Sequence, residues 1–178
     1  DEKVDGKVVK RYKGSPAGAR VWRDIFVGPS WLPPRSTPDA ELVRRRGDGG
    51  VLAREQLGPS YRGAFGIVSF VHLNPVPSED GYVYRDEGIR THATGNLVSL
   101  DWGSSHGCHR LLGMHAVRLA GFVLAHRHHV HHGEKPTRYR RVVHHRGTHR
   151  IKIDSLGDWI ELDPPIPIDV LPGTIHRP

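Results

Sequence analysis

Glycine and proline recur along the whole chain and constrain its fold more than any other feature. The 178 residues include 21 glycines and 14 prolines, and both residue types interrupt regular hydrogen-bonded segments. Such frequent interruptions favour many turns and short strands over long helices. Because hydrophobic residues make up 37% and charged residues 25% of the chain, the composition indicates a globular protein. We therefore expect a mainly β fold, built as one domain with at most a small appendage.

Apolar and β-branched runs predict the main strands. Residues 21–27 and 64–73 both have strand character, and the second run is apolar enough to be buried. Residues 74–88 are rich in turn-forming residues and predict an insertion. The tail predicts three more β-like segments, at residues 139–145, 149–154 and 158–162.

One segment has the periodicity of a helix. Residues 111–128 place apolar side chains at helical spacing and predict the principal helix of the chain. The predicted buried positions are Leu111, Leu112, His115, Leu119, Phe122 and Val123. Because Cys108 comes just before this segment, we expect the helix N-terminus to hold the cysteine. The partial positive charge at that end would favour a thiolate.

The net charge indicates a negatively charged partner but does not identify which kind. The formal charge of +7 and the pI near 9.9 imply attraction to a polyanion. Lysines and arginines are scattered and follow no zinc-finger or aromatic RNA-binding pattern, so nucleic acid, envelope polymers and anionic lipid headgroups all stay open. No apolar run approaches the roughly 20 residues that span a bilayer. The start at Asp1 is expected to be that of a mature or trimmed fragment, whose targeting segment or anchor lies outside the sequence.

The single cysteine, Cys108, lies in a sequence that favours nucleophilic chemistry. A thiol is a strong nucleophile only as a thiolate, and a nearby imidazole is the usual group that removes its proton. His106 lies two positions before the cysteine, and His92 lies further upstream. Ser105 and Gly107 are small, which lets the backbone turn sharply and direct N–H groups toward a reacting carbonyl. The leading interpretation is a Cys-His site for acyl transfer.

The same residues resemble the signature of L,D-transpeptidase catalytic domains, the YkuD-like family. In that family a histidine in an I-H-G-T-like strand end precedes an S-H-G-C-x-R/N turn. Residues 91–94 (T-H-A-T) and 105–110 (S-H-G-C-H-R) are similar to these two elements. Residues 28–34 are similar to the family's P-x-W-x-P-P element, and residues 57–59 to its L-G-P strand entry. The resemblance covers roughly residues 26–128.

The resemblance implies a fold and a domain layout. It implies a β-sandwich of the L,D-transpeptidase type over residues 21–178, with one principal helix after the cysteine turn. Residues 1–20 would form an N-terminal arm or edge strand.

The resemblance also implies a role for each residue of the site. Cys108 would be the nucleophile and His92 the general base, while His106 would shape the pocket and assist the base or the oxyanion. In the family a backbone carbonyl that follows the base orients it, so Ala93 in place of the usual glycine is compatible with function. The backbone N–H groups of Gly107 and Cys108 would form the oxyanion hole. Substrate contacts are implied for Arg110, Ser105 and Trp31, and no metal or cofactor is implied.

The implied reaction belongs to cell wall biogenesis and the control of cell shape. Cys108 would attack a peptidoglycan stem peptide, form a thioester and release D-alanine, and a second stem would then accept the acyl group. A water acceptor would make the enzyme an L,D-carboxypeptidase, a protein amine would make it an anchoring enzyme, and a hydrolase of existing cross-links would use the same site. A non-catalytic, basic and histidine-rich envelope-binding or metal-binding module is the alternative from another class. The expected location is the bacterial envelope, periplasmic or secreted.

Histidines are concentrated in residues 126–149. They are His126, His128, His129, His131, His132, His144, His145 and His149. Imidazoles bind transition metals, but no H-E-x-x-H motif occurs. Opportunistic surface metal binding, a pH-sensitive cationic face and a solvated basic helix end are the interpretations of this tract.

Overall fold

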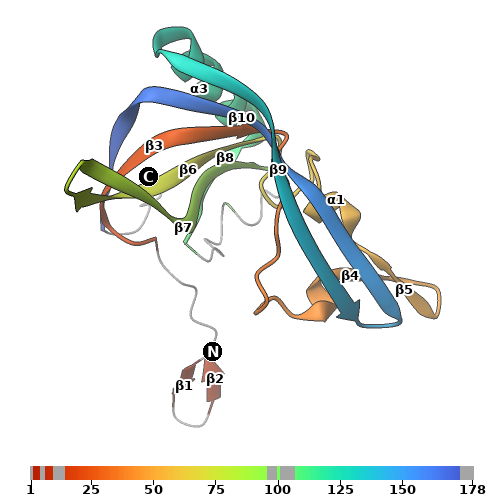
Figure 1. The fold of residues 1–178 in the computed structure, drawn as a ribbon. Coiled ribbons are helices and arrows are strands. Elements are labelled where there is room, and N and C mark those ends of the chain that lie inside the picture. The colour runs from red at the N-terminus through yellow and green to blue at the C-terminus, as the bar shows by residue number, and fades with distance from the viewer. Residues whose placement is uncertain (1, 5–6, 10–14, 96–99, 101–106, 173–178) are drawn as a thin grey trace.

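The computed structural model describes residues 2–4, 7–9, 15–95, 100 and 107–172 (Figure 1). The protein is mainly β-strand with few helices, as expected, but several strands are long rather than short. The strands are β1 (Glu2–Val4), β2 (Lys7–Val9), β3 (Gly18–Val27), β4 (Val43–Arg46), β5 (Gly49–Leu52), β6 (Val68–Ser78), β7 (Gly81–Thr94), β8 (His109–Leu112), β9 (His129–His144) and β10 (Thr148–Val170). The helices are η1 (Asp39–Glu41), α1 (Arg54–Leu57) and α3 (Gly113–His126).

Six strands form one sheet, in the order β8-β7-β6-β3-β10-β9. Its neighbouring strands are antiparallel except β7 and β8, which run parallel. Parallel neighbours need a long crossover, and the chain between Thr94 and His109 supplies it. This crossover places the segment after Cys108 at the edge of the sheet. The pairs β1–β2 and β4–β5 are separate two-stranded sheets.

Helix α3 covers one face of the six-stranded sheet (Figure 1). The predicted helix is confirmed, but its buried face differs from the predicted one. The buried residues are Gly113, Ala116, Ala120 and Val123, whereas His115 and Phe122 are exposed and Leu119 is half-buried. Small residues on the buried face let the helix lie close to the sheet, so the larger apolar side chains beside them remain outside.

Strands β9 and β10 extend beyond the rest of the sheet, and the β4–β5 pair and α1 pack near their far end (Figure 1). A second hydrophobic cluster joins these parts, and we name it the hairpin core. Its buried members are Leu42, Val43, Leu57, Val143 and Ile151. The long β9–β10 pair therefore connects the main sheet to a smaller lobe with its own apolar interior.

Several segment boundaries differ from the predictions. Residues 74–88 are not an insertion: they form the end of β6 and the start of β7, which pair across Ser78 and Gly81. The turn-forming residues in this region are accommodated within the hairpin. Strand β6 begins at Val68 rather than at residue 64. The tail strands are longer than predicted, because β9 and β10 pair along most of their length.

None of the described helices is long and apolar enough to cross a membrane.

Candidate active site

Parallel pairing of β7 and β8 brings the predicted nucleophile and base to the same edge of the sheet. His92 pairs with Arg110, and Cys108 is the residue just before β8. Paired residues share a face, and the faces alternate along a strand. Cys108, Arg110, Arg90 and His92 therefore belong to one face. Ala93 belongs to the other face, because it packs in the core with α3.

The spacing between base and nucleophile follows from this register. Cys108 lies two positions before Arg110, the partner of His92. Two positions along a strand correspond to roughly 7 Å. A substrate carbonyl that approaches Cys108 from this face would therefore lie beside the imidazole.

His92 is a buried, oriented imidazole. Its side chain is 2% exposed, and its Nδ1 lies 2.8 Å from the carbonyl oxygen of Ala93. A carbonyl only accepts, so Nδ1 carries the proton and donates it, and Nε2 of the neutral ring is the acceptor nitrogen. Burial lowers the pKa of His92 to about 4, against the hydrogen bond to Ala93, which raises it. At neutral pH the ring is an uncharged base.

Two residues that the sequence analysis missed hold this imidazole. The ring of Phe65 meets it edge to face, with centroids 5.2 Å apart. Gly66 lies against Ala93 so closely that a Cβ on it would stand 2.6 Å from the Ala93 Cβ and 2.7 Å from its carbonyl oxygen. Gly66 also has a positive φ of 62°, which glycine adopts readily. The Phe65-Gly66 pair was the only sign of this contact in the sequence, and the sequence does not show that Gly66 faces Ala93.

The thiol of Cys108 is half-buried and contacts β7. Its Sγ donates to the carbonyl oxygen of Gly88 at 3.7 Å. Burial raises the pKa of Cys108, while a hydrogen bond from the Arg90 backbone and the charges of Arg90 and Arg110 act to lower it. Burial outweighs these effects. At neutral pH Cys108 is therefore a thiol and His92 a neutral imidazole, not a thiolate and an imidazolium.

A brace on β7, unforeseen from the sequence, shapes the strand beside the sulfur. The Arg90 guanidinium makes two hydrogen bonds to the Asp86 carboxylate, at 2.6 and 2.7 Å. The same carboxylate accepts the backbone N–H of Gly88 at 2.8 Å. Burial raises the pKa of Asp86, but the Arg90 pair outweighs it, and the pKa lies below its usual range. The brace spans the irregularity in the β6–β7 pairing. Gly88 inside β7 is the sequence signal for such an irregularity, because glycine within a strand often marks a bulge.

Arg110 and Gly107 flank the nucleophile as the motif predicts. Burial lowers the pKa of Arg110, against the influence of Cys108. Gly107 has a positive φ of 107°, the conformation that glycine makes accessible in a sharp turn. Its carbonyl oxygen accepts a hydrogen bond from the Ser15 hydroxyl at 2.8 Å. The N-terminal segment therefore contacts the turn that carries the cysteine.

Of the other predicted site residues, Trp31 is described and is not brought to this edge. Ser105 and His106 lie outside the described residues. Trp31 packs on the hairpin core, and its backbone N–H donates to the Leu57 carbonyl oxygen at 2.8 Å. That bond joins the two weaker sequence elements of the resemblance to each other.

The predicted contact between the cysteine and the helix N-terminus is wrong. Strand β8 separates Cys108 from α3, which begins at Gly113. The influence of a helix dipole is confined to its first turn, so α3 gives the thiol no such assistance.

Half of the histidine-rich tract lies on β9, and only His126, which is exposed, lies at the end of helix α3. His131 Nε2 lies 2.7 Å from Asp158, and His132 Nε2 lies 2.8 Å from Glu161. These pairs link β9 to β10. Within the described part of the chain, no cluster of three or more histidine, cysteine, aspartate or glutamate side chains is arranged to hold a metal ion.

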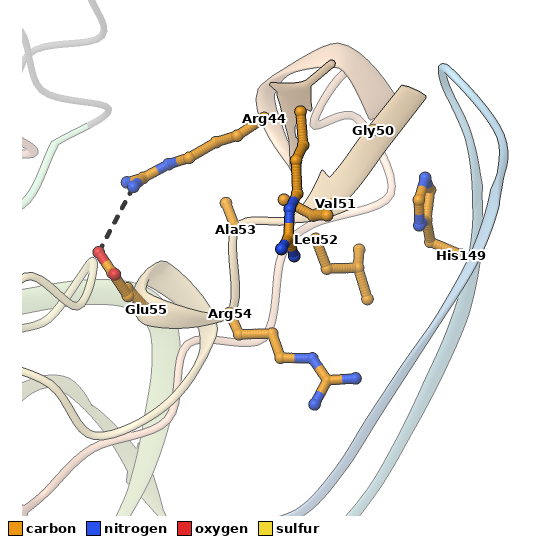
Figure 2. A pocket seen from close by; sticks show the side chains of 9 residues that line it. Arg44, Gly50, Val51, Leu52, Ala53, Arg54, Glu55 and His149 are labelled. Atoms are coloured by element: carbon orange, nitrogen blue, oxygen red, sulfur yellow. Dashed lines mark hydrogen bonds and ion pairs between the residues drawn. The ribbon is translucent and has the colours of Figure 1, made fainter. Parts of the chain in front are cut away.

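Two hollows in the protein surface lie away from Cys108. One, of about 520 Å³, lies at the β4–β5 pair (Figure 2). The other, of about 570 Å³, lies along β10 and includes Gly28 and Gly157 in its lining. Neither is lined by Cys108 or His92.

No protein-family model matches this chain, and searches of the curated proteins and of the solved structures also find no match.

Proposed function

We propose that this protein is a cysteine acyltransferase of the L,D-transpeptidase type, acting on peptidoglycan stem peptides. One observation carries the proposal: the carbonyl of the residue after His92 holds its Nδ1, two register positions from Cys108 on the same face. That is how the resemblance implies the general base to be held. The sequence motif and this orientation are independent, because the motif does not specify the tautomer.

The protonation states define the first chemical step. The Cys108 sulfur attacks the carbonyl carbon of the scissile peptide bond while the neutral His92 Nε2 takes the thiol proton. The carbonyl π electrons move to oxygen, and the backbone N–H groups of Gly107 and Cys108 stabilise that oxyanion. Because the pKa of His92 is about 4, the ring is unprotonated at any pH well above that value, and the same low pKa makes it a weak base toward the thiol.

The second half of the reaction regenerates the thiol. The tetrahedral intermediate collapses, the C–N bond breaks, and the imidazolium returns its proton to the leaving amine of D-alanine. An amine of a second stem peptide then attacks the thioester carbonyl, His92 takes the amine proton, and the C–S bond breaks to give a new amide and the thiol. The cations Arg90 and Arg110, which act on the thiol, suit a donor that carries carboxylates.

This chemistry belongs in the envelope of a bacterium, outside the cytoplasm, where stem peptides are cross-linked. The net charge of +7 favours association with anionic wall material.

The test is intact-protein mass spectrometry during turnover of purified disaccharide-tetrapeptide. We expect a transient adduct on the wild-type protein with release of D-alanine, and neither on Cys108→Ala. His92→Gln should lower the rate by roughly 10²–10⁴-fold, the usual contribution of a general base. His131→Gln is the matched control, since His131 is exposed and paired with Asp158, and its rate should equal that of the wild type.

The products identify the acceptor. Cross-linked dimers support transpeptidation, while tripeptides alone show that water accepts the acyl group and restrict the proposal to carboxypeptidase activity. The absence of adduct and product from the folded wild-type protein, or equal turnover by Cys108→Ala, would overturn the proposal.

A further inference from the structure

The hollow of about 520 Å³ at the β4–β5 pair is unusually basic. Its charged lining comprises Arg44, Arg46, Arg54 and Glu55, and His149 from β10 forms another part of the wall. Figure 2 shows that Arg54 extends from α1 toward the long β9–β10 pair, while His149 projects from that pair toward the β4–β5 pair. Its volume lies in the range of small-molecule sites.

The charges in this hollow are not balanced. Arg44 pairs with Glu55 at 3.4 Å (Figure 2), and the same carboxylate is also shared with Arg62 at 4.0 Å. Arg46 and Arg54 form no ion pair with any of the residues that the structure describes. Arg46 and Arg54 therefore add positive charge to the lining that no described carboxylate neutralises, and a bound anion would balance it.

A second observation in the same wall is independent of the arginines. Nε2 of His149 is buried and lacks a hydrogen-bond partner among the described residues. Buried polar atoms are normally satisfied, so each exception calls for an explanation. This nitrogen is shielded from solvent, and a Cβ on Gly147 would lie 3.4 Å from it, so a ligand could reach it only after the His149 side chain turns toward the hollow.

The local fold explains why the site is open. Arg44 and Arg46 are two positions apart on β4 and therefore share one face. Arg46 pairs with Gly49, which has no side chain to cover it. Gly50 lies against the β9–β10 turn so closely that a Cβ on it would meet the Arg146 Cβ at 3.0 Å. The glycines thus let the strand pair approach β10 while the space over Arg46 remains unfilled.

We propose that this hollow binds the phosphoryl group of a small phosphorylated ligand. Guanidinium groups match phosphoryl oxygens in pairs, and a phosphoryl group has enough oxygens and charge to engage more than one guanidinium. Val51, Leu52 and Ala53 add an apolar wall for the rest of the ligand. Leu52 and Arg54 also line the second hollow, so the ligand body has a direction in which to extend. This site does not depend on the chemistry of Cys108.

The test uses inorganic pyrophosphate as the probe and isothermal titration calorimetry as the measurement. We expect saturable binding to the wild-type protein, and a dissociation constant raised about tenfold or more in the variant that combines Arg46→Gln with Arg54→Gln. Arg45→Gln is the matched control. It removes one positive charge from β4, as the Arg46→Gln half of the double variant does, but Arg45 lies between the two lining positions and points to the other face. Its dissociation constant should change by less than about twofold, because the Arg45 side chain is exposed on the opposite face, where salt screens its charge.

Two further probes separate the phosphoryl site from other anion binding. Citrate should bind at least about tenfold more weakly than pyrophosphate if the phosphoryl geometry matters. A single-stranded oligonucleotide should bind no more tightly than pyrophosphate. The proposal would be overturned by no saturable pyrophosphate binding, equal losses in the Arg45 variant, equal citrate binding, or tighter oligonucleotide binding that depends on all three arginines. The last result would indicate a diffuse nucleic-acid surface.

Discussion

At the residue scale, Gly66 determines the position of the base without any chemistry of its own. It packs against Ala93, and the Ala93 carbonyl oxygen accepts the Nδ1–H of His92. A shift of Ala93 would therefore move the imidazole. Small displacements of a reacting group are costly, since a misplacement of about 1 Å can lower a rate about 100-fold.

Gly66→Ala should destabilise the fold and disturb His92 together. The positive φ costs an alanine roughly 1–2 kcal/mol, and the overlap with Ala93 adds about 1–3 kcal/mol. We expect a loss of roughly 2–5 kcal/mol in the free energy of unfolding, measured by urea denaturation. If the proposed function is right, the acylation rate of the folded fraction should fall by about tenfold or more.

Gly47→Ala is the control that separates strain from overlap. Gly47 also has a positive φ of 57°, but a Cβ on it would meet nothing within 4 Å. This variant should lose only the roughly 1–2 kcal/mol of backbone strain and keep its acylation rate. Equal losses in the two variants would contradict the close packing of Gly66 on Ala93.

At the scale of the element, α3 shows that an apolar pattern does not by itself identify a buried face. Phe122 and Val123 are consecutive apolar residues, and the sequence pattern treats both as core. In the structure Val123 lies in the core with Ile25 and Phe70, whereas Phe122 is 64% exposed and packs beside His126. The small residues Ala116 and Ala120 mark the true face, because only small side chains allow the helix to approach the sheet so closely.

Truncation of these two neighbours should therefore have unequal effects. Val123→Ala removes buried carbon and leaves a cavity, so we expect a loss of about 2 kcal/mol in unfolding free energy. Phe122→Ala removes a larger side chain from the surface and should change the free energy by about 0.5 kcal/mol or less. Urea denaturation of both variants measures the difference. A greater loss for Phe122→Ala would restore the face predicted from the sequence.

Strand β8 is the element that the sequence did not predict and that matters most for the candidate site. Residues 109–112 contain two leucines just before the helix, and the sequence analysis assigned both of them to the helix because they fit its apolar spacing. Their pairing with β7 is decided by contacts with a strand distant in the chain. That pairing places Cys108 beside Arg90 and Gly88, and removes it from the helix N-terminus.

At the scale of the whole molecule, the main sheet buries an uncharged histidine on each face. His92 lies on the face with Cys108, and His72 lies on the other face, where its Nε2 is 2.7 Å from the Thr91 hydroxyl oxygen. Both side chains are 2% exposed. Burial lowers the pKa of His72 to about 4, assisted by the nearby charges of His109, Arg90 and Arg20. The folded protein therefore holds two imidazoles neutral at a pH where an unfolded chain would protonate them.

The free energy of unfolding should consequently fall as the pH falls from about 6.5 to 4. The folded-state pKa lies below the unfolded value, so the unfolded chain binds the proton first and protonation favours unfolding. Full stability is present above about pH 6.5, and the loss levels off below the folded pKa. Each histidine should contribute a loss of about 2 kcal/mol between about pH 7.5 and pH 5. Urea denaturation at the two pH values measures it.

His72→Leu removes one of the two groups and should reduce this pH-dependent difference by about 2 kcal/mol. The loss of the Thr91 hydrogen bond affects both pH values equally, so it cancels in the comparison. His126→Gln alters an exposed histidine and should leave the difference unchanged. A wild-type difference below about 1 kcal/mol would contradict the burial of neutral imidazoles.

The sequence by itself determined the local features of this protein. Frequent glycine and proline predicted the β-rich class, apolar periodicity predicted the helix near residues 111–128, and the Cys108 motif identified the candidate nucleophile and base. These are properties of residues close together in the chain, or of a pattern that the side chains carry directly. The glycine at position 107 also adopts the positive φ expected of a sharp turn.

Only the tertiary structure decided how those features meet. The Asp86–Arg90 brace depends on an irregular strand register. The packing of Gly66 on Ala93 and the grouping of arginines around the β4–β5 hollow depend on how the chain folds in space. The charge states of Cys108 and His92 also depend on burial, which raises one pKa and lowers the other. Solvent exclusion is a property of the packed molecule, because it depends on every neighbour that displaces water. A local sequence pattern therefore identifies a reactive residue, while the folded sheet determines the pKa of that residue.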